Sequence, residues 1–146
     1  MGFRVAAVKA ISLWQPWASY IAAGMKGYET RSWATPYRGP LAIHAAKRPM
    51  TEGELELLDE YPLTLPLPFG AIVATCTLLD CVRMTDVVIA NRFERDLALG
   101  DWYPGRYAWR LVDVVPLAEP MPFRGAQGLF DTEASALGAW VSGWRK

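Results

Sequence analysis

The stretch ISLWQPWASYIAAGMKGYETRSWATPYRGPLAIHAAK, residues 11–47, holds most of the unusual features of this 146-residue chain. It contains three of the seven tryptophans, the single histidine, and one carboxylate among several cations. Cations can pair with phosphates, aromatic rings can stack on bases, and an isolated acid can accept hydrogen bonds from base amines. The stretch therefore predicts a nucleotide-sized pocket as well as the start of the fold.

The local structure of this stretch follows from its glycines, its proline and its side-chain periodicity. Pro16 suits the first turn of a helix and Gly24 suits its end, which predicts a short helix over residues 16–23. Residues 28–33 alternate as a strand does, with Glu29, Arg31 and Trp33 on one face. After the turn at residues 25–27, we expect Lys26, Glu29 and Arg31 to converge.

The residues Gly24-Met25-Lys26-Gly27-Tyr28-Glu29-Thr30-Arg31 match the Gly-x-Lys-x-x-Glu-x-Arg signature of a known family. They are preceded by Gln15-Pro16-Trp17-Ala18 and followed by Tyr37-Arg38-Gly39 and Ile43-His44-Ala45. In this order the segments resemble the ASCH family, which is named for its homology to a transcriptional coactivator. The resemblance implies an α+β fold, a PUA-like small β-barrel flanked by short helices, with the signature lining its cleft.

Length and composition favour one domain over residues 1–146. The apolar share of 52% suffices for a core. No apolar run reaches the ~20 residues of a membrane span, and the N-terminus lacks the pattern of a leader. The expected localisation is cytoplasmic, with no membrane partner. Cys76 and Cys81 lack the spacing of a redox pair or a zinc site and are expected to be reduced core residues.

Charge is unevenly distributed although the formal net charge is zero. Residues 1–50 hold seven Lys and Arg and one acid, whereas residues 51–101 hold three Lys and Arg and ten acids. If the fold gathers the early cations on one surface, they would form a basic footprint for phosphates. If they scatter, they only neutralise the acidic third.

Further elements are expected along the chain. Strands are predicted over residues 5–13, 41–46, 70–80 and 107–115, and a helix with a Thr51–Glu54 capping box over about residues 52–61, with Leu55 and Leu58 turned inward. Residues 85–99 suit a helix or an ordered loop with Val87, Val88, Phe93 and Leu97 available to the core. Asp131 can cap a last helix over residues 132–144.

In the binding hypothesis, Lys26 and Arg31 bind phosphate or carbonyl oxygens of the ligand, and Glu29 accepts a hydrogen bond from a base amine. Aromatic side chains stack on the bases. The expected ligand is single-stranded RNA or a nucleotide, bound in a basic, aromatic-lined cleft. The cleft would be completed by Ser12, Gln15, Trp17, Trp33, Arg38, Lys47 and Arg124. A surface salt-bridge cluster is the simpler alternative for the three motif residues.

A catalytic hypothesis remains open beside the binding one. Some small relatives of this family hydrolyse an acetylated cytidine with a lysine and a threonine three residues later, but Glu29 stands at that place here. Other members are associated with RNA cleavage, in which Lys26 and Glu29 would be catalytic and His44 or Tyr37 could move protons. His44 is otherwise a satisfied core residue.

No cofactor is expected, and one histidine with dispersed acids predicts no metal site. A protein partner that meets the aromatic side chains is a third functional class. The oligomeric state does not follow from the sequence.

Overall fold

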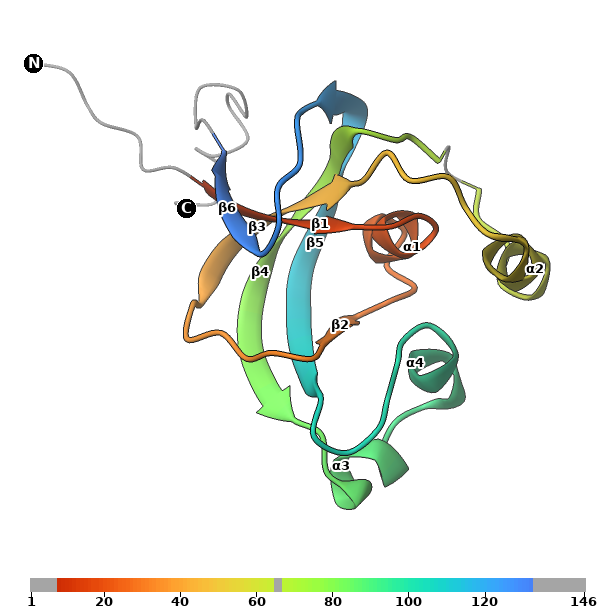
Figure 1. The fold of residues 1–146 in the computed structure, drawn as a ribbon, viewed down its shortest axis with the longest axis vertical. Helices are drawn as coiled ribbons and strands as arrows, with labels where there is room; N and C mark the ends of the chain where they lie inside the picture. The colour runs from red at the N-terminus through yellow and green to blue at the C-terminus, as the bar shows by residue number, and fades with distance from the viewer. Residues whose placement is uncertain (1–7, 65–66, 133–146) are drawn as a thin grey trace, which may run out of the picture.

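The computed structural model describes residues 8–64 and 67–132 of the chain. A six-stranded sheet forms the centre of the molecule (Figure 1). The strands follow the order β2-β5-β4-β3-β1-β6 across the sheet. Their bounds are β1 Val8–Leu13, β2 Tyr28–Arg31, β3 Gly39–Ala45, β4 Ala71–Arg83, β5 Tyr107–Pro122 and β6 Leu129–Thr132. Four helices accompany them, namely α1 Trp17–Ala22, α2 Glu52–Glu60, α3 Asp86–Ala90 and α4 Glu94–Ala98.

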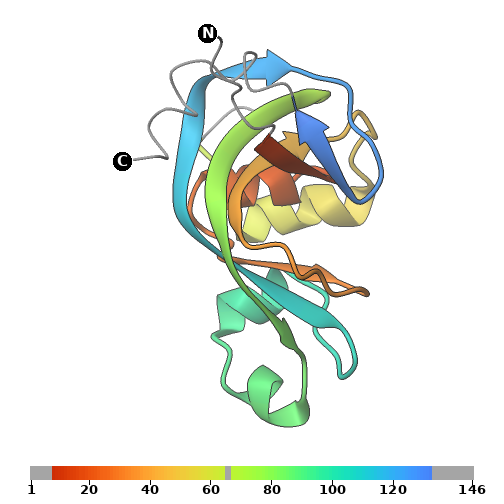
Figure 2. The same ribbon diagram turned by 90° about the vertical axis from the view of Figure 1, so that its left-hand side faces the viewer.

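The predicted α+β fold with a curved sheet and short helices is confirmed, but over the described residues the sheet stays open and does not close into a barrel. Strands β4 and β5 are the longest and bend along their length, with register shifts between residues 72 and 80 of β4 (Figure 2). Closure would require the two edge strands to pair with each other. Instead β2 and β6, with four residues each, lie at opposite ends of the strand order.

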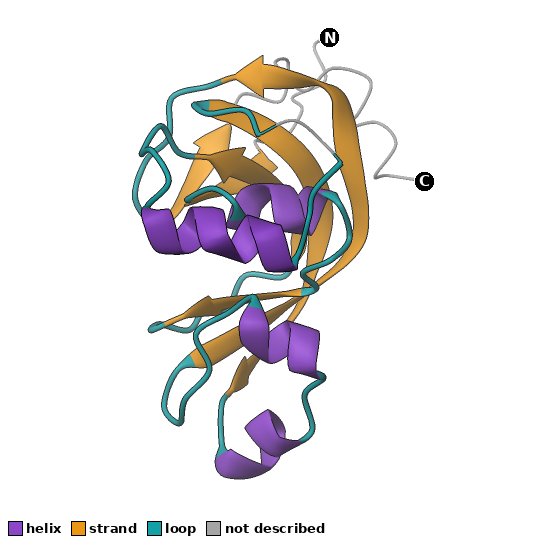
Figure 3. Cartoon of the chain, turned by 90° about the vertical axis from the view of Figure 1, so that its right-hand side faces the viewer, coloured by secondary structure: helices purple, strands orange, loops and turns teal. Residues whose placement is uncertain are grey.

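The helix α1 fills the hollow of the curved sheet and packs against β1, β3, β4 and β5. Ala18 and Ile21 of α1 are fully buried there, and the core also contains Leu41, Leu78 and Trp109. Helix α2 lies on the same side of the sheet as α1 (Figure 3). The Tyr20 hydroxyl of α1 donates to the backbone of α2 and its C-terminal cap, at 2.7 Å from Tyr61 O.

Helix α1 and strands β1 to β5 confirm the elements predicted for residues 8–122, with one extension. Strand β5 was predicted to end at residue 115 but continues to Pro122, and it contains Pro116, Pro120 and Pro122. Proline cannot donate a ladder hydrogen bond, so it is tolerated where one strand edge is unpaired. In the described part of the chain, β2 pairs with β5 only through residues 107–110. Residues 111–122 of β5 therefore have no strand partner among the described residues on the edge where β2 pairs.

Helix α2 confirms the capping box but reverses the predicted orientation of one side chain. Thr51 Oγ1 accepts from Glu54 N at 3.3 Å, and Glu54 Oε1 accepts from Thr51 N at 2.8 Å. Glu54 also bonds Arg48, and it is buried, whereas Leu55, expected inward, is 49% exposed. The polar contacts of Glu54 therefore determine which face of α2 turns inward.

Residues 85–99 form two five-residue helices, α3 and α4, beyond the end of β4. The prediction that Val87, Val88, Phe93 and Leu97 supply the core is wrong: Val87 is 70%, Phe93 80% and Leu97 39% exposed, and Val88 is only half-buried. A five-residue helix makes little more than one turn and can bury only a small part of its surface. The buried residues of this region are Met84 and Leu99, which precede and follow the helices.

The last helix predicted for residues 132–144 lies almost entirely outside the described residues. Asp131, its expected cap, lies in β6 and pairs with Lys9 at 2.7 Å. Cys76 and Cys81 are free thiols as predicted, and burial raises the pKa of Cys76 to about 12. Among the helices described, none is sufficiently long and apolar to cross a bilayer.

Candidate functional site

A cavity of about 960 Å³ opens beside β2. Four segments that are distant in sequence supply its walls: residues around 12–17, residues 29–33, residues around 98–101, and residues 126–128. Glu54 of α2 and Arg106, just before β5, also line it. The curved sheet therefore brings the signature strand together with one helix and two loops.

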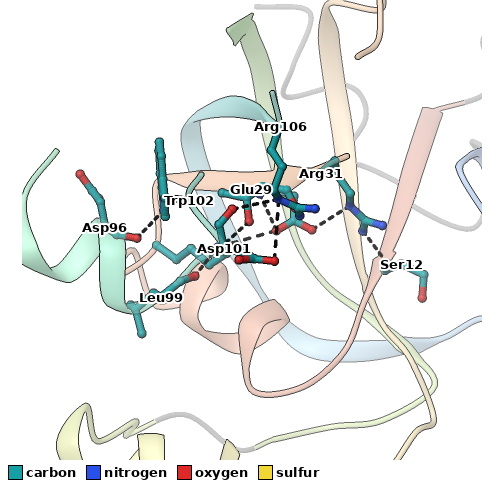
Figure 4. A network of polar contacts seen from close by, with 10 residues as sticks. Ser12, Glu29, Arg31, Asp96, Leu99, Asp101, Trp102 and Arg106 are labelled. Atoms are coloured by element: carbon teal, nitrogen blue, oxygen red, sulfur yellow. Dashed lines mark hydrogen bonds and ion pairs between the residues drawn. The ribbon is translucent and has the colours of Figure 1, made fainter. Parts of the chain in front are cut away.

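Lys26, Glu29 and Arg31 converge as predicted, and Figure 4 shows Glu29 beside Arg31. Arg31 Nε lies 3.0 Å from Glu29 Oε2, and Lys26 Nζ lies 3.7 Å from Glu29 Oε1. Arg31 Nη2 also donates to Ser12 O at 2.9 Å, which ties β2 to β1. Glu29 and Arg31 line the cavity, whereas Lys26 lies behind Glu29.

The Lys26 side chain is 3% exposed, and its ammonium donates a hydrogen bond to the carbonyl oxygen of Leu99. Burial lowers the pKa of Lys26 from its ordinary value, and the neighbouring Glu29 carboxylate offsets part of this effect. Lys26 is therefore not among the residues that line the cavity, and its ammonium lies beside the Glu29 carboxylate, which does line it.

A second polar network joins the motif strand to the loop that follows α4. Thr30 Oγ1 accepts from Asp101 N at 3.0 Å, and Arg106 Nε donates to Asp101 O at 2.9 Å. Arg106 Nη2 also donates to Thr30 O at 3.3 Å. The two networks are adjacent in Figure 4, so both sides of β2 are held by side-chain contacts.

The charged residues of the lining are of mixed sign. Three acids, Glu29, Glu54 and Asp101, lie beside two arginines, Arg31 and Arg106. The predicted basic cleft is therefore wrong at the cavity surface. This composition suits a ligand that presents hydrogen-bond donors as well as anionic oxygens.

Three tryptophans border the cavity, of which Trp17 and Trp33 were predicted. Both are half-buried against the core, and Trp33 meets Trp109 edge to face with ring centroids 4.8 Å apart. Trp14 precedes α1, lines the same cavity and is 56% exposed. The aromatic lining therefore has two anchored rings and one open ring.

Ser12 lines the cavity and contacts His44, which is 2% exposed on β3. His44 Nε2 lies 2.6 Å from Phe123 O, and Nδ1 lies 2.9 Å from Ser12 Oγ. A carbonyl oxygen only accepts, so Nε2 carries the proton, and Nδ1 of the neutral ring accepts from Ser12. Burial lowers the pKa of His44, and the bond to Phe123 O partly offsets this. These contacts support the core role of His44.

Gln15 makes its hydrogen bonds inside the protein and is 0% exposed. Its Nε2 donates to Ser19 Oγ at 2.7 Å and to Pro68 O at 2.9 Å, and its Oε1 accepts from Ser19 N at 3.0 Å. The expectation that Gln15 contacts a ligand is therefore corrected to a structural role at the start of α1.

Four further predicted residues lie outside the cavity lining. Arg38 donates to Thr35 O and Tyr37 O at 2.8 Å each and so fixes a turn, while the Tyr37 hydroxyl bonds Pro40 O. Lys47 is exposed and packs over Gly70, and Arg124 is exposed in the loop before the cavity residues 126–128. The early cations are thus spread out, as the alternative interpretation of the charge pattern predicted.

The sequence did not identify Trp14, Glu54, Asp101 or Arg106 as site residues. Trp14 stands directly before the Gln15-Pro16-Trp17 flank of the signature, which is a local signal for it. The other three lie more than 20 residues from the signature, and no local pattern places them beside it. In the ranges 8–64 and 67–132, no three His, Cys, Asp or Glu side chains gather to hold a metal ion.

Comparison with known proteins agrees with this combination of sheet and signature. The sequence profile of the ASCH domain matches residues 11–121, and the chain belongs to this family. The ASCH protein of Zymomonas mobilis has the same fold, with a TM-score of 0.59 and 20% identity over 93% of this chain and 94% of that one. A single-residue variant of it gives a TM-score of 0.60 at 20% identity, covering 94% and 98%.

Two animal proteins share part of the sequence. Activating signal cointegrator 1 of Mus musculus is 38% identical over 87 residues, which are 58% of this chain and 15% of that protein. The Homo sapiens protein of the same name is 38% identical over 81 residues, which are 49% of this chain and 14% of that protein. The chain thus matches about one seventh of the length of these curated relatives.

Proposed function

We propose that the cavity beside β2 binds a nucleotide within single-stranded RNA, or a free nucleotide. The observation that carries this proposal is the Glu29–Arg31 pair at 3.0 Å, which lines a cavity that Trp17 and Trp33 also border. The general association of ASCH domains with RNA binding supports the same ligand class.

The paired side chains match the edges of a nucleobase. Glu29 accepts hydrogen bonds from base amines or imines, and the Arg31 guanidinium donates to carbonyl or phosphate oxygens. Arg31 Nε and Nη2 are engaged with Glu29 and Ser12. Both groups are therefore held in place before a ligand arrives, which reduces the entropy that binding must offset.

The mixed charge of the lining limits the electrostatic part of binding. Two cavity arginines would make two phosphate contacts, so log K should fall with log salt at a slope of about 1.4, from ~0.7 per contact with a single strand. A uniformly basic groove would give a much steeper slope.

The test is a titration of a short single-stranded RNA at several salt concentrations. Arg31→Ala should weaken binding by about tenfold or more, because it removes a charged donor worth roughly 1.5–3 kcal/mol. Arg83→Ala is the matched control, since Arg83 is exposed at the end of β4 and outside the cavity lining. Undetectable binding at low salt, or equal affinities in the two variants, would reject the proposal.

A hydrolase acting on RNA or on an acetylated cytidine is the second candidate. Burial lowers the pKa of Lys26, and strongly perturbed lysines are enriched at catalytic sites. The hydrogen bond of Lys26 to Leu99 O weighs against a direct catalytic role. Incubation of the protein with an acetylated cytidine and with labelled RNA, followed by product analysis, separates the two. Turnover that Glu29→Ala abolishes in a folded protein would favour the enzyme.

A further inference from the structure

The rim of the cavity carries a group of side chains outside the signature: Trp14, Arg48 and Glu54. The Arg48 guanidinium carbon lies 3.8 Å from the centroid of the Trp14 ring, and Arg48 Nη2 lies 2.7 Å from Glu54 Oε2. Trp14 and Glu54 both line the cavity. We propose that Trp14 is the platform of a second base-binding subsite, so that the cavity receives two adjacent nucleotides of a single strand. This inference rests on the proposed function.

The exposure of Trp14 is the first observation that supports the subsite. Its side chain stays 56% exposed on the folded surface. A tryptophan in this state leaves a large apolar area in water, which stacking with a base would cover. Arg48 occupies one side of the ring as a cation–π partner, and Trp14 is one of the residues that line the cavity. Trp17 and Trp33 are packed against the core, so Trp14 presents the most open indole of the three.

The support beneath Trp14 is the second observation. Glu54 bonds both Arg48 and the backbone of Thr51, the N-cap of α2. Burial would raise the pKa of Glu54, but the hydrogen bonds from Thr51 and Arg48 outweigh this, so that its pKa lies below the ordinary value. Glu54 is then ionised at neutral pH and keeps Arg48 in place under the ring. A preorganised platform binds with a smaller loss of side-chain entropy.

The connection of the two subsites through one short segment is the third observation. Arg31 is tied to Ser12 O, and Trp14 follows Ser12 by two residues. Two residues of extended chain span about 7 Å, so the Trp14 backbone is close to the point at which Arg31 is held. The cavity has a volume of about 960 Å³. Small-ligand sites typically measure roughly 300–1000 Å³, so this cavity lies near the upper end of that range.

The test compares a mononucleotide with a dinucleotide by isothermal titration calorimetry, using AMP and the 5′-phosphorylated dinucleotide pApA. Wild-type protein should bind pApA at least about fivefold more tightly than AMP, the gain expected for one stacked base. Trp14→Ala should remove this gain and leave the affinity for AMP unchanged. Trp14→Phe, which keeps an aromatic face, should retain most of it.

Phe93→Ala is the matched control, because Phe93 is 80% exposed and outside the cavity lining. It should leave both affinities unchanged. If Trp14 only braces α2 through Arg48, Trp14→Ala would lower the melting temperature and leave the ratio of the two affinities as in the wild type, which overturns the inference. If AMP binds and Arg31→Ala weakens it while Trp14→Ala leaves the ratio unaltered, the proposed function stands and the second subsite fails. Absence of binding to either probe rejects both.

Discussion

Two glutamates that line the cavity, Glu29 and Glu54, each pair with an arginine, and the two pairs are alike in geometry but not in surroundings. Glu29–Arg31 is 3.0 Å long and Glu54–Arg48 is 2.7 Å long, and both acids are nearly buried. The second oxygen of Glu29 lies 3.7 Å from the buried Lys26 ammonium, whereas that of Glu54 accepts from the backbone of Thr51. Glu29 therefore compensates a buried charge, and Glu54 caps a helix.

The largest predicted effect is a difference in the free energy of unfolding between variants of Glu29 and Glu54. Glu29→Gln strands the Lys26 ammonium without its carboxylate and should reduce the free energy of unfolding by about 3–5 kcal/mol. Glu54→Gln keeps an oxygen for Thr51 N and should cost about 1 kcal/mol. Urea denaturation measures both. The double variant Lys26→Met/Glu29→Gln should recover part of the loss, and equal losses for the two single variants would refute the distinction.

The next effect concerns the loop of residues 123–128, which lies close to Ser12 and His44 and supplies cavity residues 126–128. A Cβ at Gly125 would lie 2.7 Å from His44 Cε1 and 3.2 Å from Ser12 Oγ. Gly125→Ala should therefore displace the loop and cost about 1–3 kcal/mol. Gly53→Ala is the control, because a Cβ there meets nothing within 4 Å and Gly53 lies inside α2. That variant should be neutral or stabilising by up to about 1 kcal/mol. Similar melting temperatures for the two variants would contradict the close approach.

A smaller effect tests whether the stability of α2, which carries Glu54, affects ligand binding at Glu29 and Arg31. Thr51→Ala removes the hydroxyl that accepts from Glu54 N, and it should cost about 1 kcal/mol of unfolding free energy. Its affinity for AMP should stay within about twofold of wild type, since additivity holds for separate sites. Thr85→Ala, at the exposed N-cap of α3, serves as the comparison. A large loss of AMP binding in Thr51→Ala would show that α2 and the Glu29–Arg31 pair are coupled.

The smallest predicted effect is a pH trend from His44, which belongs to neither pair. Its pKa is lower in the folded protein than the ordinary value of about 6.5, so the unfolded chain binds the proton more readily. The stabilisation from neutral His44 is therefore present above about pH 6.5 and is lost as the pH falls through the folded-state pKa. Unfolding free energies between pH 5.5 and 7.5 should show a shallower slope for His44→Asn than for wild type. Parallel curves would contradict this trend.

Much of the fold could be predicted because its signals are local. Strand alternation, the proline and glycine around α1, and the Thr51–Glu54 capping box each depend on a few neighbouring residues. The prediction failed where long-range packing decides, as for Phe93 on the short α4 and for Pro116, which lies in β5. Barrel closure also depends on how far the two edge strands lie apart, which no local pattern encodes.

The sequence by itself determined the convergence of Lys26, Glu29 and Arg31, because a turn and a two-residue repeat place them without reference to the rest of the chain. Only the tertiary structure decided that Trp14, Glu54 and Arg106 line the same cavity as Glu29 and Arg31. It also decided that Gln15 and His44 make their hydrogen bonds inside the protein. The physical reason is that contacts across tens of residues depend on the curvature and register of β4 and β5, which arise from the packing of the whole core.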